Sequence, residues 1–451
     1  MYFSSSYKYF ITLFLPLLLT QAAQVGTNTF SSIFSGQAST IDLAGVAVAV
    51  NIWYPLFAGI NGLFFGVSPI IAQLRGAEKT EEIPQYIIHS IYIAIFFTIF
   101  IIIFGSLCLT PFLNIMGLEP AVYHIAKHYL IALSFGILPI FIQATLRYIV
   151  DAHGMTRISM GILLINLLCT LILFRLLIFG AGPIPALGGI GTGYAITIAS
   201  WISCLLFLSL FKWYSPFSTY RIHHLFPTFK WYYCLQELKI GIPIFIAVFC
   251  ESSLFSIVGL LMAEFGTVYI AANQAAISYS TFLYTFPWSI SLAATILIGY
   301  EVGAKRYAGA RQYARLCQIT ALGMSAFFAI LTYRFTMPIS HLFTNDPITM
   351  QAISHFLFFA MMFTIVDAAG TPLQGMLRGY KDVTIITYVA FITYWLISIP
   401  LGYSIAHYTH FGPYGYWISS VISLTINAIA LNYRLWGHTA YPERQLNALT
   451  K

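Results

Sequence analysis

Long runs of apolar residues, separated by short polar connections, dominate this sequence. Their pattern is helical and lacks the strict alternation of a transmembrane β-barrel. A helix needs about 20 apolar residues to cross the hydrocarbon core of a bilayer. The sequence therefore predicts an all-α, polytopic membrane protein with twelve transmembrane helices. These are expected near residues 8–34, 45–72, 86–112, 121–150, 158–180, 189–212, 238–263, 271–299, 314–338, 349–377, 383–408 and 412–434.

The composition agrees with a lipid-facing surface. Of the 451 residues, 59% are hydrophobic and only 8% are charged, whereas a soluble domain has about 25% charged residues. So few charges cannot cover a surface that faces water. The net charge of +7 could suggest a nucleic-acid partner. The basic residues are not clustered on one face, however, and no nucleic-acid binding is expected.

The basic residues indicate the orientation instead. All but three of the 21 lysines and arginines fall in one set of loops and termini, the exceptions being Lys127, Arg175 and Arg334. Loops rich in Lys and Arg lie on the cytoplasmic side. Because the number of spans is even, both termini are predicted to be cytoplasmic.

The longest polar connection marks the predicted boundary between two lobes. It runs from about Lys212 to Glu237, near the middle of the chain. We therefore predict an amino-terminal lobe at 1–225 with spans 1 to 6, and a carboxy-terminal lobe at 226–451 with spans 7 to 12.

The two halves also resemble each other. At a shift of 227 residues, Pro16 falls on Pro243 and Gly76-Ala77 falls on Gly303-Ala304. Such matches, in order and on matching sides of the membrane, predict a duplicated six-helix unit. Two parallel repeats with the binding site between them are a transporter architecture.

Two carboxylates lie where charge is costly. Glu251 and Asp367 are well inside predicted spans, and a carboxylate at the bilayer centre costs about 2.5–3.5 kcal/mol. No basic residue is expected at a comparable depth in the same half. A buried carboxylate beside another one takes up H⁺ or Na⁺ readily and releases it when its surroundings change, as a coupling site requires. The alternative is that each carboxyl is simply protonated and holds helices together.

Uncharged polar residues within the spans could complete a cavity. Aromatic residues, 17% of the chain, could add binding for flat organic cations. The alternative for each polar residue is a hydrogen bond between helices. The first half is polar but uncharged, because Gln24 occupies the repeat position of Glu251. The candidates are Gln24, Asn28, Ser31, Asn51 and Asn166 in the first half, and Asn273, Gln274, Ser278 and Tyr279 in the second.

Several segments, spread in order along nearly the whole chain, resemble one transporter family. They are Ile41-Asp-Leu-Ala-Gly-Val46, Pro69-Ile-Ile-Ala-Gln-Leu74, Gly188-Gly-Ile-Gly191, Gly241-Ile-Pro243, Phe249-Cys-Glu251, Ala271-Ala-Asn-Gln274, Phe286-Pro-Trp-Ser289 and Leu377-Arg-Gly-Tyr-Lys-Asp382. The likeness is to the multidrug and toxic compound extrusion (MATE) family, in its NorM-type bacterial branch.

The resemblance implies two pseudo-symmetric six-helix bundles around a central cleft, in a bacterial inner membrane. It also implies antiport, in which Na⁺ or H⁺ enters while an organic cation or drug leaves. Glu251 and Asp367 match the cation-linked carboxylates of the family's second lobe. The sequence departs from the family at Ser31, where span 1 usually has an Asp, and at Asn273, where span 8 usually has a His. Coupling is therefore expected in the second lobe.

The predicted function is cation-coupled export of organic cations by alternating access. The chain is expected to act as a monomer in the lipid bilayer, with Na⁺ or H⁺ as coupling ion at Glu251 and Asp367 and with no other cofactor. One alternative is a flippase for lipid-linked oligosaccharides, which should need a strongly cationic cleft. Another is an intramembrane enzyme, but the sequence has no HExxH motif, no convincing GxSxG motif and no Cys/His cluster.

Overall fold

The computed structural model describes residues 2–221 and 228–438, so the predicted lobe boundary between residues 225 and 226 lies outside the described part. The regular elements of the described chain are all helices, apart from one isolated β-bridge between Ala181 and Ile184. In chain order the α-helices are α1 (Tyr2–Ala38), α2 (Thr40–Phe65), α3 (Val67–Gly76), α4 (Ile83–Ile115), α5 (Pro120–Ser134), α6 (Ile137–Ala152), α7 (Thr156–Phe179), α8 (Gly189–Trp213), α9 (Trp231–Leu261), α10 (Thr267–Gly303), α11 (Tyr307–Arg334), α12 (Thr336–Phe343), α13 (Pro347–Gly379), α14 (Val383–Ala390), α15 (Ile399–Tyr408) and α16 (Gly415–Tyr433).

The helices account for every predicted span. Eleven helical segments in the described part are long and apolar enough to cross a membrane. The pair α5 and α6 passes the same test together, with a bend of 54° between the two helices, and counts as the twelfth. The predicted all-α fold with twelve spans is confirmed.

The helix starts repeat at one interval. Thr40 and Thr267 begin α2 and α10, and Pro120 and Pro347 begin α5 and α13, each pair being 227 residues apart. Proline suits the first turn of a helix because the amide hydrogen that it lacks has no partner there. The interval found in the sequence therefore recurs in the positions where helices begin.

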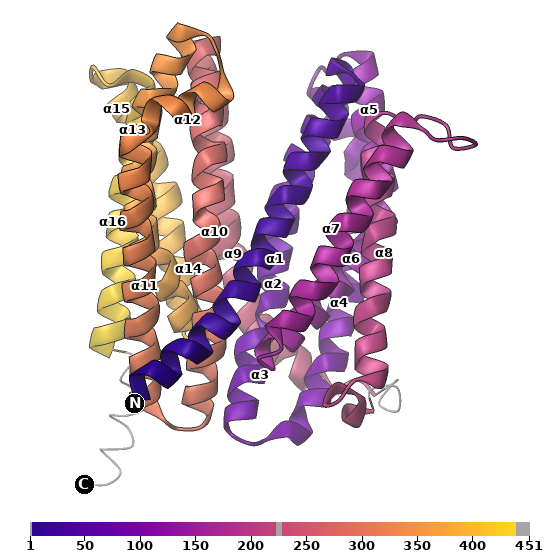
Figure 1. Cartoon of the computed structure of the whole chain (residues 1–451), viewed down its shortest axis with the longest axis vertical. Helices are drawn as coiled ribbons and strands as arrows, with labels where there is room; N and C mark the ends of the chain where they lie inside the picture. The colour runs from indigo at the N-terminus through magenta and orange to yellow at the C-terminus, as the bar shows by residue number, and fades with distance from the viewer. Residues whose placement is uncertain (1, 222–227, 439–451) are drawn as a thin grey trace. The chain divides into compact units, whose positions relative to one another are not determined.

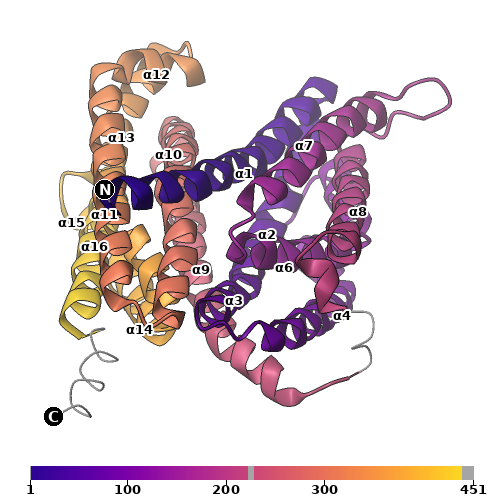
Figure 2. The ribbon, with the colours of Figure 1, turned by 60° about the horizontal axis from the view of Figure 1, so that its bottom comes forward.

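The helices pack into two compact units. The carboxy-terminal unit comprises Met1–Leu18, Arg75–Glu78 and Ile242–Lys451, and the amino-terminal unit comprises Leu19–Leu74 and Lys79–Gly241. In the carboxy-terminal unit α13 packs against α10, α11 and α16 (Figure 1). In the amino-terminal unit α8 packs against α5, α6 and α7, and α7 and α8 lie side by side in both views (Figures 1 and 2).

A capping contact joins two distant segments of the amino-terminal unit. The Asp42 carboxylate accepts a hydrogen bond of 2.6 Å from the backbone N–H of Gly189, at the start of α8. Ser39 caps α2 by accepting a bond of 2.9 Å from the Asp42 N–H, and its hydroxyl donates to the Asp42 carboxylate at 2.7 Å. A carboxylate at a helix amino terminus is stabilised by free N–H groups and by the helix dipole. Asp42 therefore has a structural role.

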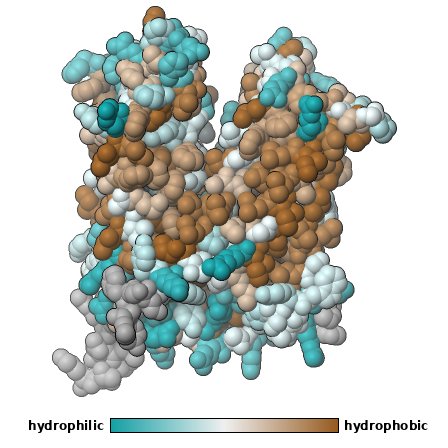
Figure 3. All heavy atoms as spheres, viewed as in Figure 1, coloured by the Kyte–Doolittle hydropathy of each residue, from teal (hydrophilic) through white to brown (hydrophobic). Residues whose placement is uncertain are grey.

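The surface of each unit is apolar across its middle. Figure 3 shows hydrophobic side chains over the central part of the visible face and hydrophilic ones at the two ends. Large apolar side chains such as Leu107 and Ile330 are more than two-thirds exposed, at 69% and 68%. Water would penalise such a surface, whereas lipid tails do not.

Gly375 allows α13 to approach α10 closely. A Cβ atom added there would clash with the backbone oxygen and the hydroxyl of Ser291. We expect Gly375→Ala to destabilise the protein by about 1–3 kcal/mol, the usual range for overpacking. Thermal unfolding in detergent measures the effect. Gly323→Ala is the matched control, because a Cβ at Gly323 meets no atom within 4 Å; an equal loss in both variants would contradict the packing argument.

Candidate functional site

A stripe of polar side chains runs along one face of α13. Asp367, Thr371, Gln374 and Arg378 follow one another at intervals of four, three and four residues, which place them on the same side of a helix. None of the four is more than 3% exposed. The Thr371 hydroxyl donates to the Asp367 carboxylate at 2.8 Å, and the Arg378 guanidinium donates to the Gln374 side-chain oxygen at 3.0 Å.

Glu251 of α9 lies near this stripe. Its carboxyl group interacts electrostatically with Asp367 and with the Arg378 guanidinium. The Tyr284 hydroxyl, from α10, lies beside the Glu251 carboxyl. The two acidic residues selected from the sequence are therefore neighbours in the carboxy-terminal unit.

A second tyrosine reaches the pair from an unusual helical segment. A π-helix (Phe391–Ser398) joins α14 to α15 and carries Tyr394. Tyr394 is 2% exposed and interacts electrostatically with both Glu251 and Asp367. Its hydroxyl has no hydrogen-bond partner among the residues that the structure describes. The π-helix, a conformation often found at functional sites, thus carries a buried hydroxyl that interacts electrostatically with both carboxyl groups.

The structure corrects the expectation that no basic residue lies near the acidic pair. The sequence predicts Arg378 at the cytoplasmic end of its span, yet its side chain is fully buried, with the guanidinium carbon 5.1 Å from the centre of the Trp288 ring. Side chains on a helix point towards its amino terminus. A long arginine at the end of α13 can therefore reach back towards Glu251. In the amino-terminal unit Arg147 is likewise buried, 3.8 Å from Asp151.

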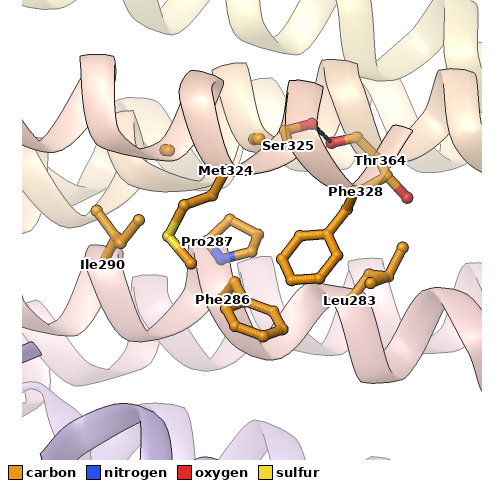
Figure 4. A pocket seen from close by; sticks show the side chains of 10 residues that line it. Leu283, Phe286, Pro287, Ile290, Met324, Ser325, Phe328 and Thr364 are labelled. Atoms are coloured by element: carbon orange, nitrogen blue, oxygen red, sulfur yellow. Dashed lines mark hydrogen bonds between the residues drawn. The ribbon is translucent and has the colours of Figure 1, made fainter. Parts of the chain in front are cut away.

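A small apolar cavity adjoins the polar stripe. It has a volume of about 10 Å³ and lies between α10, α11 and α13. Phe286 and Phe328 face each other across it, with ring centres 4.5 Å apart, and Ser325 donates to the Thr364 backbone oxygen at 3.1 Å (Figure 4). Its wall includes Ala368, the residue after Asp367. The cavity therefore touches α13 next to the position of Asp367, but neither Asp367 nor Glu251 lines it.

The polar residues predicted in span 8 separate into two groups. Asn273 is buried and accepts a hydrogen bond of 2.8 Å from the Trp417 indole of α16. Tyr279 is half-buried and shares a hydrogen bond of 2.6 Å with Thr332 of α11. Gln274 and Ser278 are exposed. Asn273 and Tyr279 thus join helices within the carboxy-terminal unit.

The first-half candidates belong to the amino-terminal unit. Asn28 and Asn51 are exposed, Gln24 is half-buried and Ser31 is buried. Asn166 donates to the Ser203 hydroxyl at 2.8 Å and to the Ala199 backbone oxygen at 3.0 Å. The Asn166 side chain is therefore engaged between α7 and α8.

Comparison with known proteins identifies the family. The MatE family model matches residues 16–175 and 243–404, more than half of the chain. Probable multidrug resistance protein NorM of Oceanobacillus iheyensis is 42% identical over 430 residues, which cover 95% of this chain and 96% of that protein. Its counterpart from Bacillus subtilis is 39% identical over 428 residues and covers 95% of each chain.

Solved structures share the fold. The eukaryotic MATE transporter AtDTX14 superposes with a TM-score of 0.84 at 18% identity and covers 96% of each chain. A mutant of the Vibrio cholerae MATE transporter VcmN gives a TM-score of 0.86 at 19% identity and covers 97% of this chain and 99% of that one. With two copies of the family model matched in one chain and near-complete alignment to NorM proteins, this multi-pass membrane protein is a MATE transporter and not an enzyme.

Proposed function

We propose that this protein exports organic cations, drugs among them, in exchange for a coupling cation bound at Glu251 and Asp367. The observation that carries the proposal is the pairing of these two carboxyl groups inside the carboxy-terminal unit, with Thr371, Tyr284 and Tyr394 around them. Carboxylate, hydroxyl and phenol oxygens are ligands that a proton or Na⁺ can use. The names of the relatives, multidrug resistance proteins, support the substrate class.

The charges near the pair suggest how many cations bind. Glu251 and Asp367 together carry two negative charges when ionised, and Arg378 supplies one positive charge. Uncompensated charge is costly in a buried site. One bound H⁺ or Na⁺ would bring this group to neutrality, so we infer one monovalent cation per cycle at this site. A net acidic group of this kind gives no support to the flippase alternative, which called for a cationic cleft.

Transport requires that the cation and the drug favour different conformations. A ligand shifts a conformational equilibrium only by its differential affinity for the two states. Cation binding would favour one conformation by neutralising the acidic pair, and the organic cation would favour the other. Membrane voltage adds about 2.3 kcal/mol per charge per 100 mV to the driving force. The proposal includes a monomer in a bacterial inner membrane with both termini cytoplasmic.

Efflux from proteoliposomes tests this proposal. Purified protein is reconstituted with ethidium, a fluorescent planar cation, and an imposed Na⁺ gradient and an imposed pH gradient are applied separately. We expect one of the two gradients to accelerate ethidium movement over that in empty vesicles, because the acidic pair binds the coupling ion. Equal rates with and without protein under both gradients would contradict the proposed function.

A further inference from the structure

The first turns of α9 pack against α4 within the amino-terminal unit. The sequence predicted this span from about residue 238, but α9 begins at Trp231. The rings of Tyr86 and Tyr233 meet edge to face, with centres 4.9 Å apart. One turn further along each helix, the Ser90 hydroxyl donates to the Glu237 carboxyl at 2.6 Å. Glu237 thus sits in a contact between helices and not in a loop.

Glu237 is an acidic residue that the proposed transport site does not use. Its side chain is fully buried. One carboxyl oxygen accepts the bond from Ser90, and the other has no hydrogen-bond partner within residues 2–221 and 228–438. In the same part of the chain no salt bridge involves Glu237, and no charged side chain acts on its carboxyl.

The titratable groups around Glu237 do not balance a negative charge. Tyr86 of α4 and Cys234 of α9 interact with it electrostatically, and both are neutral at physiological pH. His89 of α4 accepts the backbone N–H of Lys230 at 2.8 Å and lies 2.6 Å from the Gln85 backbone oxygen through its other ring nitrogen. Both ring nitrogens of His89 are thus engaged by backbone groups and not by Glu237.

An ionised carboxylate in this setting would be strongly disfavoured. An uncompensated charge in a buried site is strongly unfavourable, and Glu237 has no ion-pair partner in the described chain. A proton on its free oxygen removes the charge and supplies a hydrogen-bond donor.

We propose that Glu237 is a second, exchangeable proton-binding site of this transporter, located in the amino-terminal unit. With its proton bound, the carboxyl group keeps α9 against α4 through Ser90. Loss of the proton places a bare charge between Ser90 and Tyr86 and loosens the contact. The amino-terminal unit, which has Ser31 and Gln24 in place of acidic residues, would in this way still respond to protons.

The position of Glu237 on α9 connects this proton site to Glu251 of the proposed coupling site. Glu237 and Glu251 lie on the same helix, and the two-unit division falls between them, after Gly241. Fourteen residues of this one helix separate them, with Pro243 in between. A change in how α9 is held at Glu237 would therefore be felt along the helix that carries Glu251.

Infrared difference spectroscopy on the purified full-length protein tests the proposal without any transport measurement. Spectra recorded in acidic and alkaline buffer are subtracted, which isolates the C=O stretch of carboxyl groups that exchange a proton. We expect the wild type to show one protonated-carboxyl band that Glu237→Gln lacks. The control Glu81→Gln removes an exposed carboxylate near the start of α4 and should retain the band.

A second variant keeps the test decisive if Glu237→Gln does not fold. Ser90→Ala removes the hydrogen bond to Glu237 and should shift the frequency of the same band. Identical difference spectra for the wild type and Glu237→Gln would overturn the proposal. If Glu237→Gln does not fold, identical spectra for the wild type and Ser90→Ala would overturn it. Failure of ion-driven ethidium efflux would count against the proposed function and leave this proton site standing, because the spectra are recorded without substrate.

Discussion

Glu251→Gln and Asp367→Asn are each expected to reduce ion-driven ethidium efflux to the rate of empty proteoliposomes. Each change keeps the shape of the side chain and removes its ability to hold an exchangeable cation. The group that remains, one carboxylate together with Arg378, then carries no net charge before any cation binds. Binding a further cation would add net positive charge to a buried site, which is unfavourable. The ion gradient therefore can no longer drive the transport cycle.

The measurement compares initial rates under the gradient that drives the wild type, at equal amounts of inserted protein. Glu119→Gln is the matched control, since Glu119 is an exposed carboxylate in the connection before α5. It should transport like the wild type. Wild-type efflux by both Glu251→Gln and Asp367→Asn, at normal insertion, would show that the pair is not the coupling site.

The sequence was sufficient for the fold because lipid imposes simple rules on it. Each span must be long, apolar and helical, so the ends of the twelve spans could be predicted to within seven residues. The repeat was visible because prolines and glycines such as Pro16 and Pro243 stay at fixed intervals. Glu251 and Asp367 were predicted from the free-energy cost of a carboxylate inside the membrane alone, since few carboxylates occur deep inside apolar runs.

What the sequence could not supply was the surroundings of the acidic pair. Thr371, Gln374 and Arg378 do follow Asp367 at helical spacing, a signal that could have been read as a polar stripe. The sequence pattern instead predicts Arg378 in the connection after the span, because its backbone lies at the end of α13, whereas its guanidinium is buried. Tyr284 and Tyr394 gave no signal, since 30 tyrosines occur in the chain.

Contacts between residues far apart in the sequence could not be predicted either. Ser90 and Glu237 are 147 residues apart, and each alone is an ordinary residue near the end of a span. The same holds for the 2.6 Å contact between Asp42 and Gly189, also 147 residues apart. Both pairs belong to segments with clear helical patterns, but a pattern gives the face of a helix and not the partner helix that covers it.

Arg378→Gln is expected to change how export depends on the coupling cation. The variant leaves two carboxyl groups without the positive charge that acts on Glu251 in the wild type. Neutrality then requires two monovalent cations, so the Hill coefficient for the coupling ion should rise from about one towards two. We also expect the rate of ethidium efflux at a fixed gradient to fall about tenfold or more, equivalent to about 1.4 kcal/mol. The reason is that the second cation must be bound before the conformational change.

Arg378→Lys separates charge from geometry. Lysine keeps the positive charge but loses the planar group that donates to Gln374 at 3.0 Å and lies over the Trp288 ring. Its rate should fall while its Hill coefficient stays near that of the wild type. Initial rates at a series of Na⁺ or H⁺ concentrations give both quantities. If Arg378→Gln kept the wild-type Hill coefficient, Arg378 would have no part in the charge balance of the coupling site, and the inferred single cation per cycle would lose its basis.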